Sequence, residues 1–564
     1  MAKAGHAYPQ VDPGTAGLMD RRVAAVPRGL SVAAALARAA RADARVLVLG
    51  SRIAVLQGEL ARAARWGLGG VRASDIAWHE VPVIAPSTPE IVVRRLVLAG
   101  ASMLLVREGS RIVGVVDGRA ARWARPALSV AHRLEQAGEP SRETAVWLLR
   151  LAGKLGEAMG VTVWAAGGFV RDLLRDSGAL DVDLVVEGDG TAFARRLGDE
   201  VRGRVTVHRA FGTASVEEGR TVDGAALPRV DIATARRERY SAPGALPSVE
   251  PAPLAEDLLR RDFTINALAI SLAPAGFGRL VDAAGGQRDL DRRRLVPLQP
   301  LSFVEDPTRV FRAARYMARL GYHLDAQGRR ALRLGQSRAY PALSGTRLQA
   351  EIALILREPT AWRALAVLLR WGAFRLWDRG YRAAGRTPER LRAARRLLTW
   401  AGTAGLTADA VDVALLALLV DQPRGVGRRA LARLGIGGSR GGRLAEAMTR
   451  GPRLARRLAG RGLAPSRVAT AARAVPTETL LAAWLVGGPS ARRRLMWFAR
   501  EGRHVRAGLG AEALLSAGIP RGPAVGQALR ALRDRRLDGR PASVADEERF
   551  VKRESARYRK GESA

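Results

Sequence analysis

Two aspartates at the start of a short apolar run, in the middle of the chain, restrict its fold more than any other feature. The run spans residues 180–186, which alternate and then become apolar and β-branched, as buried strands do. Side chains two positions apart on a strand share one face, so Asp181 and Asp183 should project together. Paired carboxylates repel each other unless a cation lies between them, and Mg²⁺ is typically held by one or two carboxylates plus substrate phosphates. The run therefore predicts a strand that starts at a Mg²⁺ site, although a bare Asp-x-Asp is more often a solvated strand end.

A glycine pair, Gly167 and Gly168, lies one segment earlier. It follows a strand-like run at residues 161–166 and precedes a helix-like segment at residues 169–175. Backbone N–H groups at the start of a helix attract phosphate, and Arg171 adds a charged donor beside them. The segment is either a phosphate-binding turn or an ordinary strand-to-helix turn with a surface arginine.

A third aspartate lies in a later strand-like run, residues 229–234. Asp231 either completes a metal-binding triad with the first two aspartates or pairs with Arg236 or Arg237.

Residues 260–270 are expected to open a helix, with Asp262 as its N-cap. Asn266 would then lie one turn later on the same face. The two side chains could bind a pair of ribose hydroxyls while Arg261 reaches a triphosphate. A capped helix with a basic start is the alternative.

The next helix is expected to begin at Glu305 and Asp306, which a proline follows. Arg309, Arg312 and Arg315 then recur every three residues and should share one side of it. Asp306 and Arg309 offer an acceptor and a fork of donors about one turn apart, which suits the edge of a nucleobase. A solvated basic face is the usual meaning of such a row.

These segments, in this order, resemble the class II tRNA nucleotidyltransferase family, whose close relatives include bacterial poly(A) polymerases. The resemblance covers roughly residues 140 to 350. It implies a template-independent transferase that adds CCA, or only the terminal A, to the 3′ end of tRNA from ATP, and from CTP if the full CCA is added. It further implies Mg²⁺ as cofactor on Asp181 and Asp183, and Asp231 is kept as a candidate third catalytic residue. The implied nucleotide contacts are Gly168, Arg171, Arg261, Asp262, Asn266, Glu305, Asp306, Arg309, Arg312 and Arg315.

Two other functions stay open at this point. One is a poly(A) polymerase of the same fold, and the other is a non-enzymatic protein that binds RNA or senses nucleotides. Residues 181–189 resemble a longer-chain branch of the family, some of whose members add only A or only C. Full CCA addition does not follow from the sequence.

The N-terminal region, residues 26–125, is expected to form a separate unit with an internal duplication. Helix, two strands and helix are expected at residues 30–41, 46–49, 52–56 and 59–66, and again at 89–98, 103–106, 111–116 and 120–123. This order resembles a pair of CBS modules, which often bind adenine nucleotides. The positions after the last strand that usually carry the nucleotide ligands hold Asp117 and Ala120, so a structural or dimerising role, and with it a homo-oligomer, is the alternative.

Composition and charge restrict the kinds of site and of binding partner that the chain can have. The 564 residues include no cysteine, which excludes disulfides and cysteine-bound zinc. No apolar run approaches the length that crosses a membrane, and no leader pattern is seen, so we expect a cytoplasmic protein. The net charge is +38, and residues 351–564 carry 42 Lys and Arg against 18 Asp and Glu. Such a field attracts a polyphosphate backbone without reading its sequence.

The C-terminal region is expected to be helical, with Gly/Pro breaks between the helices. Helices are expected at residues 389–401, 408–419, 428–434, 477–486 and 491–502, and a basic turn around Arg521 separates two more. This turn either binds an RNA phosphate or is a plain helical hairpin.

The expected fold is thus an α/β N-terminal half, made of a CBS-like pair and a nucleotidyltransferase palm with a mixed β-sheet, followed by an all-α neck, body and tail. The expected boundaries are 1–25 for a flexible tail, 26–125 for the CBS-like module, 140–290 for the catalytic head, 291–350 for the neck and 351–564 for the tRNA-binding body and tail.

Overall fold

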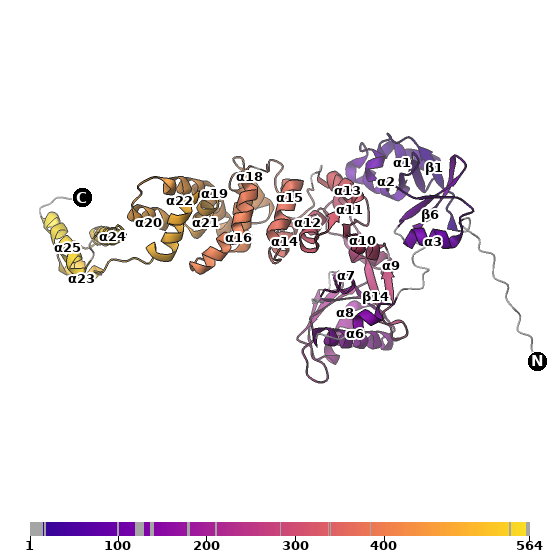
Figure 1. Ribbon diagram of the computed structural model, residues 1–564, viewed down its shortest axis with the longest axis horizontal. Coiled ribbons are helices and arrows are strands. Elements are labelled where there is room, and N and C mark those ends of the chain that lie inside the picture. Colours follow the sequence, from indigo (N-terminus) through magenta and orange to yellow (C-terminus); the bar gives the residue numbers. More distant parts are fainter. Residues whose placement is uncertain are drawn as a thin grey trace, which may run out of the picture. The chain divides into compact units, whose positions relative to one another are not determined.

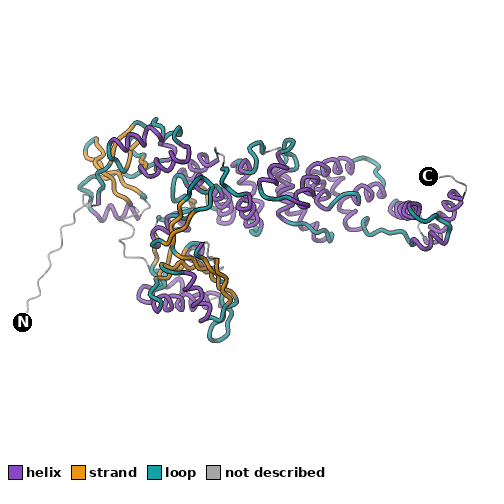
Figure 2. The backbone as a smooth tube through the Cα atoms, turned by 180° about the vertical axis from the view of Figure 1, so that it is seen from behind, coloured by secondary structure: helices purple, strands orange, loops and turns teal. Residues whose placement is uncertain are grey.

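The structure is a computed structural model of the chain. It describes residues 15, 18–98, 101–118, 129–135, 140–177, 181–208, 211–282, 284–336, 338, 340–383, 385–540 and 543–559. The chain divides into two compact units, Met1–Leu343 and Ser344–Ala564. Every strand of the described residues belongs to the first unit, and the second is helical (Figure 2). The expected sequence of an α/β region followed by a largely helical one is therefore confirmed.

The first unit contains a seven-stranded mixed sheet, one strand of which, β14, is labelled near α7 and α8 in Figure 1. Its order is β15 (Leu280–Asp282), β14 (Leu268–Ser271), β7 (Thr162–Ala166), β8 (Val182–Glu187), β11 (Val230–Thr234), β10 (Thr213–Glu217) and β9 (Arg204–His208). All neighbours are antiparallel except β8 and β11. The strands expected around residues 161–166, 180–186 and 229–234 are present, because their β-branched side chains fill the sheet's buried faces.

The helix expected at residues 260–270 is wrong. A single 3₁₀ turn, Thr264–Asn266, leads directly into strand β14, which is buried along its whole length between β7 and β15. A short apolar run has no periodicity that separates a buried strand from a buried helix. The tertiary structure decides between them here.

Two helices rather than one follow the head sheet. Helix α11 (Ser302–Glu305) ends at Glu305, and α12 (Thr308–Leu320) starts after Pro307. The expected single helix start at Glu305 is therefore wrong by three residues. Phe263 packs against Phe303 of α11 and Tyr316 of α12, with ring centroids 6.3 and 5.9 Å apart. These rings attach the two helices to the head.

In the N-terminal module, residues 18–98 and 101–118, one order of elements occurs twice. Strand, helix, strand and strand recur as β1 (Val23–Val26), α1 (Val32–Arg41), β2 (Val46–Leu49) and β3 (Ala54–Leu56), then as β4 (Val83–Ile84), α3 (Glu90–Leu98), β5 (Met103–Glu108) and β6 (Arg111–Asp117). In both halves the first two strands are parallel and the last two antiparallel. One buried cluster joins the halves through side chains such as Val48 and Leu105. The last expected helix, residues 120–123, lies outside the described residues.

The second unit consists of α14 to α25 with two short irregular helical turns. The expected helices appear as α16 (Thr387–Thr403), α17 (Ala410–Leu419), α18 (Val426–Arg433), α21 (Thr477–Val486) and α22 (Pro489–Trp497), and the basic turn lies between α23 (Ala511–Ser516) and α24 (Pro523–Leu537). Sequence analysis missed α19 (Gly438–Ala459), which contains Pro452 and several glycines. A Cβ on Gly451 would lie 2.6 Å from Ala482 Cβ of α21, so the glycine permits close helix packing instead of ending the helix. No helix in the described part of the chain is long and apolar enough to cross a bilayer.

Candidate active site

Strands β8 and β11 bring the three predicted aspartates to one sheet face. Asp183 pairs in register with Asp231 on the neighbouring parallel strand, and Asp181 precedes β8 by one residue. Register partners, and side chains two residues apart, point to the same face. We call Asp181, Asp183 and Asp231 the carboxylate edge. Asp181 and Asp231 are exposed, and Asp183 is half-buried.

The carboxylate edge carries uncompensated negative charge at Asp183. Burial raises the pKa of Asp183 to about 6; Arg261 and Arg171 lower it, while Asp231 and Asp181 raise it. A cation would remove this penalty, because it favours the charged form of a carboxyl group. Asp181 and Asp183 therefore fit a Mg²⁺ that substrate phosphates complete.

Asp231 has an arginine partner other than the two that were expected. It forms an ion pair with Arg229 at 2.9 Å, and neither Arg236 nor Arg237 is its partner. Among the residues that the structure describes, no group of three or more His, Asp or Glu side chains gathers closely enough to hold an ion alone. The candidate metal site consists of the Asp181–Asp183 pair, and a role of Asp231 as the third catalytic residue stays a prediction.

The glycine turn lies against this edge. Gly167 has φ +70° and ψ −124°, a conformation that side-chain-bearing residues rarely adopt. A Cβ on Gly167 would lie 2.5 Å from Arg261 Nη1, and one on Gly168 would lie 3.6 Å from Asp183 Oδ2. The absence of a side chain at Gly167 therefore allows the turn before α7 (Gly168–Leu174) to approach Arg261, whereas a Cβ on Gly168 would be in ordinary contact with Asp183.

Arg171 is not the surface arginine of the alternative interpretation. It is 3% exposed and donates to Asp172 at 2.6 Å and to Asn266 Oδ1 at 2.8 Å. Asn266 in turn donates to Asp262 Oδ1 at 2.9 Å, and Asp262 Oδ2 accepts from Arg312 at 2.8 Å. We call Arg171, Asp172, Asn266, Asp262 and Arg312 the arginine network.

Charge within the arginine network is closely compensated. Burial alone would raise the pKa of Asp262, yet the Arg312 guanidinium and the hydrogen bond from Asn266 bring it down to about 2. Asp262 and Asn266, expected to bind ribose hydroxyls, are 6% and 5% exposed. Their side chains connect Arg171 to Arg312 in this structure, and their contact with a ribose stays a prediction.

Arg261 forms an ion pair with a buried aspartate that was not predicted from the sequence. Asp257 of α9 (Leu254–Leu259) is fully buried and accepts from Arg261 Nη2 at 3.0 Å. The i, i+4 spacing of the two residues was the available signal. This pairing holds the Arg261 guanidinium next to the glycine turn, where a triphosphate would also lie.

Arg309 is buried rather than part of a solvated face. It is 5% exposed, and it donates to Ser302 Oγ at 2.9 Å, to Glu305 Oε2 at 3.4 Å and to the Arg260 carbonyl at 2.9 Å. Burial works to lower the pKa of the Arg309 guanidinium, but Glu305 and other acidic neighbours raise it above its usual value. Arg309 therefore stays charged, with its donors committed inside the protein.

The other predicted neck residues have distinct positions. Asp306 accepts from Thr308 N at 3.0 Å and from Thr308 Oγ1 at 2.7 Å, and Thr308 is the first residue of α12. Arg312 and Arg315 are half-buried, each with its guanidinium above the Tyr316 ring. The sequence row of arginines thus divides into one buried member and two that reach the surface beside an aromatic ring.

Glu238 is a further residue that sequence analysis passed over. Its carboxylate accepts from Tyr240 Oη at 2.9 Å and from Arg260 Nη1 at 2.7 Å, and its side chain is 8% exposed. Burial raises the pKa of Tyr240. Because the Arg260 carbonyl also accepts from Arg309, Glu238 supports the backbone that holds Arg309.

The head of the protein matches a known family. Residues 163–296 match the family model described as the poly A polymerase head domain. This segment, about a quarter of the chain, is therefore similar to that head domain. The head domain so bounded contains the glycine turn, the carboxylate edge and Arg261, whereas Arg309 lies beyond it.

Relatives and solved structures extend the similarity past the head domain. The chain is 36% identical over 362 residues to the A-adding tRNA nucleotidyltransferase of Geobacter sulfurreducens, covering 60% of this chain and 40% of that protein. It is 39% identical over 233 residues to the CC-adding tRNA nucleotidyltransferase of Deinococcus radiodurans, covering 40% of this chain and 58% of that protein. The Thermotoga maritima CCA-adding enzyme complexed with tRNA aligns with a TM-score of 0.62 and 26% identity over 76% of this chain and 98% of that chain. The chain thus spans 40% to 58% of the length of these two curated relatives.

Proposed function

We propose that this chain is a template-independent tRNA nucleotidyltransferase, which adds the terminal A or the full CCA to the 3′ end of tRNA. The names of its relatives support this reaction, and so does a solved CCA-adding enzyme of 27% identity and TM-score 0.67. One observation carries the proposal: Asp181 and Asp183 share a strand face that touches a glycine turn and Arg261.

In the proposed reaction the 3′ hydroxyl of the RNA attacks the α-phosphorus of a nucleoside triphosphate. A new P–O bond forms, the bond to the pyrophosphate breaks, and the hydroxyl proton is lost. Mg²⁺, when bound, supplies the positive charge that favours the attacking oxygen and the leaving pyrophosphate. Asp181 and Asp183 would hold that ion, and the glycine turn with Arg261 would orient the triphosphate.

The neck would select the base: Arg312 and Arg315 are half-buried on α12, and Arg309 of the same helix would contact the base after it releases one of its present partners. The finer divisions are part of the same proposal: a CBS-like N-terminal module, a catalytic head, a nucleotide-selecting neck, and a basic helical body and tail that hold tRNA. The duplicated topology of the module and the excess of arginine beyond residue 350 support these assignments.

A direct assay tests the function. Purified protein is incubated with Mg²⁺, labelled ATP or CTP, and tRNA lacking its last one, two or three nucleotides, or an unrelated RNA. If only the tRNA that ends in CC grows, and by a single A, the protein is an A-adding enzyme. If all three shortened tRNAs grow to a complete CCA end, it is a CCA-adding enzyme. Long A tails on any RNA would instead identify a poly(A) polymerase, the alternative that the head-domain family favours.

A matched pair of variants connects the activity to the site. Asp183→Asn should abolish transfer, whereas Asp189→Asn should not. Asp189 follows the same strand but caps α8 (Gly190–Glu200) through Thr191 N and Ala192 N, and asparagine caps a helix equally well. Full transfer by Asp183→Asn would contradict the proposed carboxylate site.

A further inference from the structure

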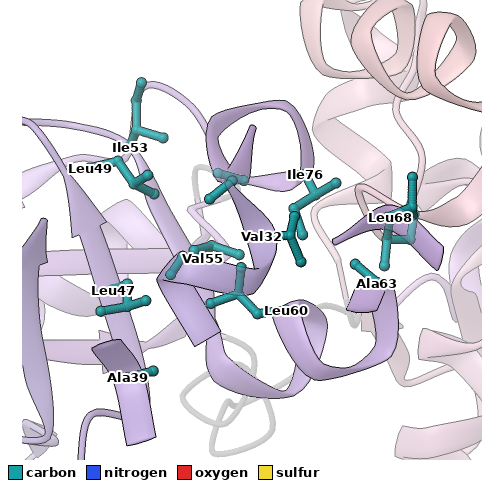
Figure 3. Close-up of a cluster of buried hydrophobic side chains, with 14 of the residues drawn as sticks. Val32, Ala39, Leu47, Leu49, Ile53, Val55, Leu60, Ala63, Leu68 and Ile76 are labelled. Carbon is teal, nitrogen blue, oxygen red and sulfur yellow. The ribbon is translucent and has the colours of Figure 1, made fainter. Parts of the chain in front are cut away.

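The N-terminal module and the neck share one buried cluster of apolar side chains, here called the shared cluster. Val32, Leu60 and Ile76 of the module belong to it (Figure 3). So do Leu301 and Val304 of α11 and Leu334 of α13 (Ala326–Gln336). Helix α11, which ends at Glu305, is therefore placed by contacts with the module as well as with the head.

Arg62 reaches the neck from the module. It lies on α2 (Gln57–Ala63), and its Nη1 donates to Gln299 Oε1 at 2.8 Å and to Glu305 Oε1 at 3.3 Å. Its guanidinium lies 6.0 Å from the ring centroid of Trp66, and its side chain is 31% exposed. The module thus supplies a charged donor to a carboxylate of the neck.

The Glu305 carboxylate connects Arg62 to Arg309. One carboxylate oxygen accepts from Arg62 and the other from Arg309, at 3.4 Å. The Glu305 and Arg309 side chains are only 9% and 6% exposed. A carboxylate so far removed from water interacts strongly with both guanidinium groups. Each guanidinium occupies one of its two oxygens, so Arg62 limits how many hydrogen bonds Arg309 can donate to Glu305.

We infer that Arg62 is a positioning residue for nucleotide selection, which acts through Glu305 on Arg309. This inference rests on the proposed function, because Arg309 selects a nucleotide only if the chain transfers one. Arg309 has its donors committed, so it must release a partner before it can present them to a base. With Arg62 present, one Glu305 oxygen is occupied. Without Arg62, both oxygens can bind Arg309 as a bidentate pair, and its release becomes less favourable.

The first test replaces Arg62 in the full-length protein. Arg62→Met keeps the aliphatic stem beside Trp66 but removes the charge. The readout is kcat/KM for the preferred nucleotide divided by kcat/KM for each of the other three, on a matched tRNA end. We expect this ratio to fall about 5-fold, the lower end of typical coupling between sites, because Arg62 is partly exposed. Arg62→Lys should restore part of it, since an ammonium can still reach one oxygen.

Two controls separate selection from folding. Arg65→Met changes an exposed arginine three residues further along the chain, and it should leave the ratio unchanged. In a background of Arg309→Ala, Arg62→Met should add no further loss, because residues that act through one another are not additive. Gln299→Leu, which removes the other partner of Arg62, should lower the ratio less than Arg62→Met does.

Each outcome decides the inference. An unchanged ratio in Arg62→Met with only a lower melting temperature would show that Arg62 merely docks the module. An equal change in Arg65→Met, or an additive loss with Arg309→Ala, would also overturn it. If the wild-type protein transfers no nucleotide to any RNA, the proposed function fails instead. Equilibrium binding of ATP and CTP then tests Arg62, with the same 5-fold change expected in the ratio of their Kd values.

Discussion

The carboxylate edge and the arginine network are neighbouring parts of the same head, but they differ in how far arginine side chains neutralise their carboxylates. In the network, Asp262 and Asp172 each contact arginine side chains inside the protein. At the edge, burial raises the pKa of Asp183 to about 6, the neighbouring carboxylates of Asp231 and Asp181 add to this rise, and Arg261 and Arg171 oppose it. The first arrangement stabilises the fold, whereas the second leaves charge that only a ligand can compensate. Carboxylates that repel one another at one edge, in a protein whose other charged side chains are mostly paired, are typical of functional sites.

The largest effect should follow Asp183→Asn, which removes charge from the edge. Nucleotide transfer should fall by about 10³-fold or more, because the metal contributes several kcal/mol to the transition state. The free energy of unfolding should stay unchanged or rise by up to about 1 kcal/mol as repulsion is relieved at this half-exposed group. Single-turnover kinetics and urea unfolding measure the two quantities. A destabilised protein would mean that the edge is paired, and the contrast with the network would be lost.

Asp262→Ala should have the opposite pattern of effects. It leaves the half-buried Arg312 and the buried Asn266 without their carboxylate partner. Removing one member of a buried pair costs about 3 kcal/mol of unfolding free energy. Urea unfolding monitored by tryptophan fluorescence would measure the loss. A change below about 0.5 kcal/mol, typical of surface substitutions, would show that the network is not what holds the head together.

The pH dependence of stability sharpens the same point. The pKa of Asp262 falls from 3.8 to about 2 on folding, so its contribution is complete above pH 4 and is lost as the pH falls toward 2. This contribution is on the order of 2 kcal/mol. The difference in unfolding free energy between the wild-type protein and Asp262→Asn should therefore be constant from about pH 7 to pH 5 and shrink below pH 4. A difference that does not change down to pH 3 would contradict the pairing with Arg312.

The smallest effect should come from the glycine turn. Gly167→Ala places a methyl group 2.5 Å from Arg261 Nη1, and the strained backbone alone costs on the order of 1–3 kcal/mol. We expect about a tenfold loss of transfer in addition, since small displacements of positioning groups reduce rates strongly. Gly160→Ala is the matched control: Gly160 has φ +68° and nothing within 4 Å of its Cβ position. Equal losses of transfer in both variants would assign the effect to stability alone.

The sequence predicted those parts of the site that depend on local pattern. Strands β7, β8 and β11 follow from β-branched runs, and the shared face of Asp181 and Asp183 follows from the period of a strand. Strand β14 was not predictable, because Leu268–Ser271 is apolar on both faces and its partners are distant in sequence. Helix α19 was missed because the close approach that uses Gly451 is a tertiary property.

Side-chain contacts between residues far apart in the sequence could not be predicted either. Arg171 and Asn266 bond across 95 residues and Arg62 and Glu305 across 243, and nothing near either residue in the sequence indicates its partner. The sequence therefore left a surface arginine at 171 and a solvated row at 309 open as alternatives to nucleotide contacts, where the structure has buried donors. The nucleotide contacts of these residues stay predictions.

The shared cluster has a consequence for how the first unit opens. Leu301, Val304 and Leu334 lie in the same core as Leu47 and Leu60, so the neck cannot separate from the module without exposing both sides of that core. Contiguous cores of this kind tend to unfold as one cooperative unit. Amide hydrogens of α11 and of strand β2 should then exchange with solvent at similar rates under native conditions.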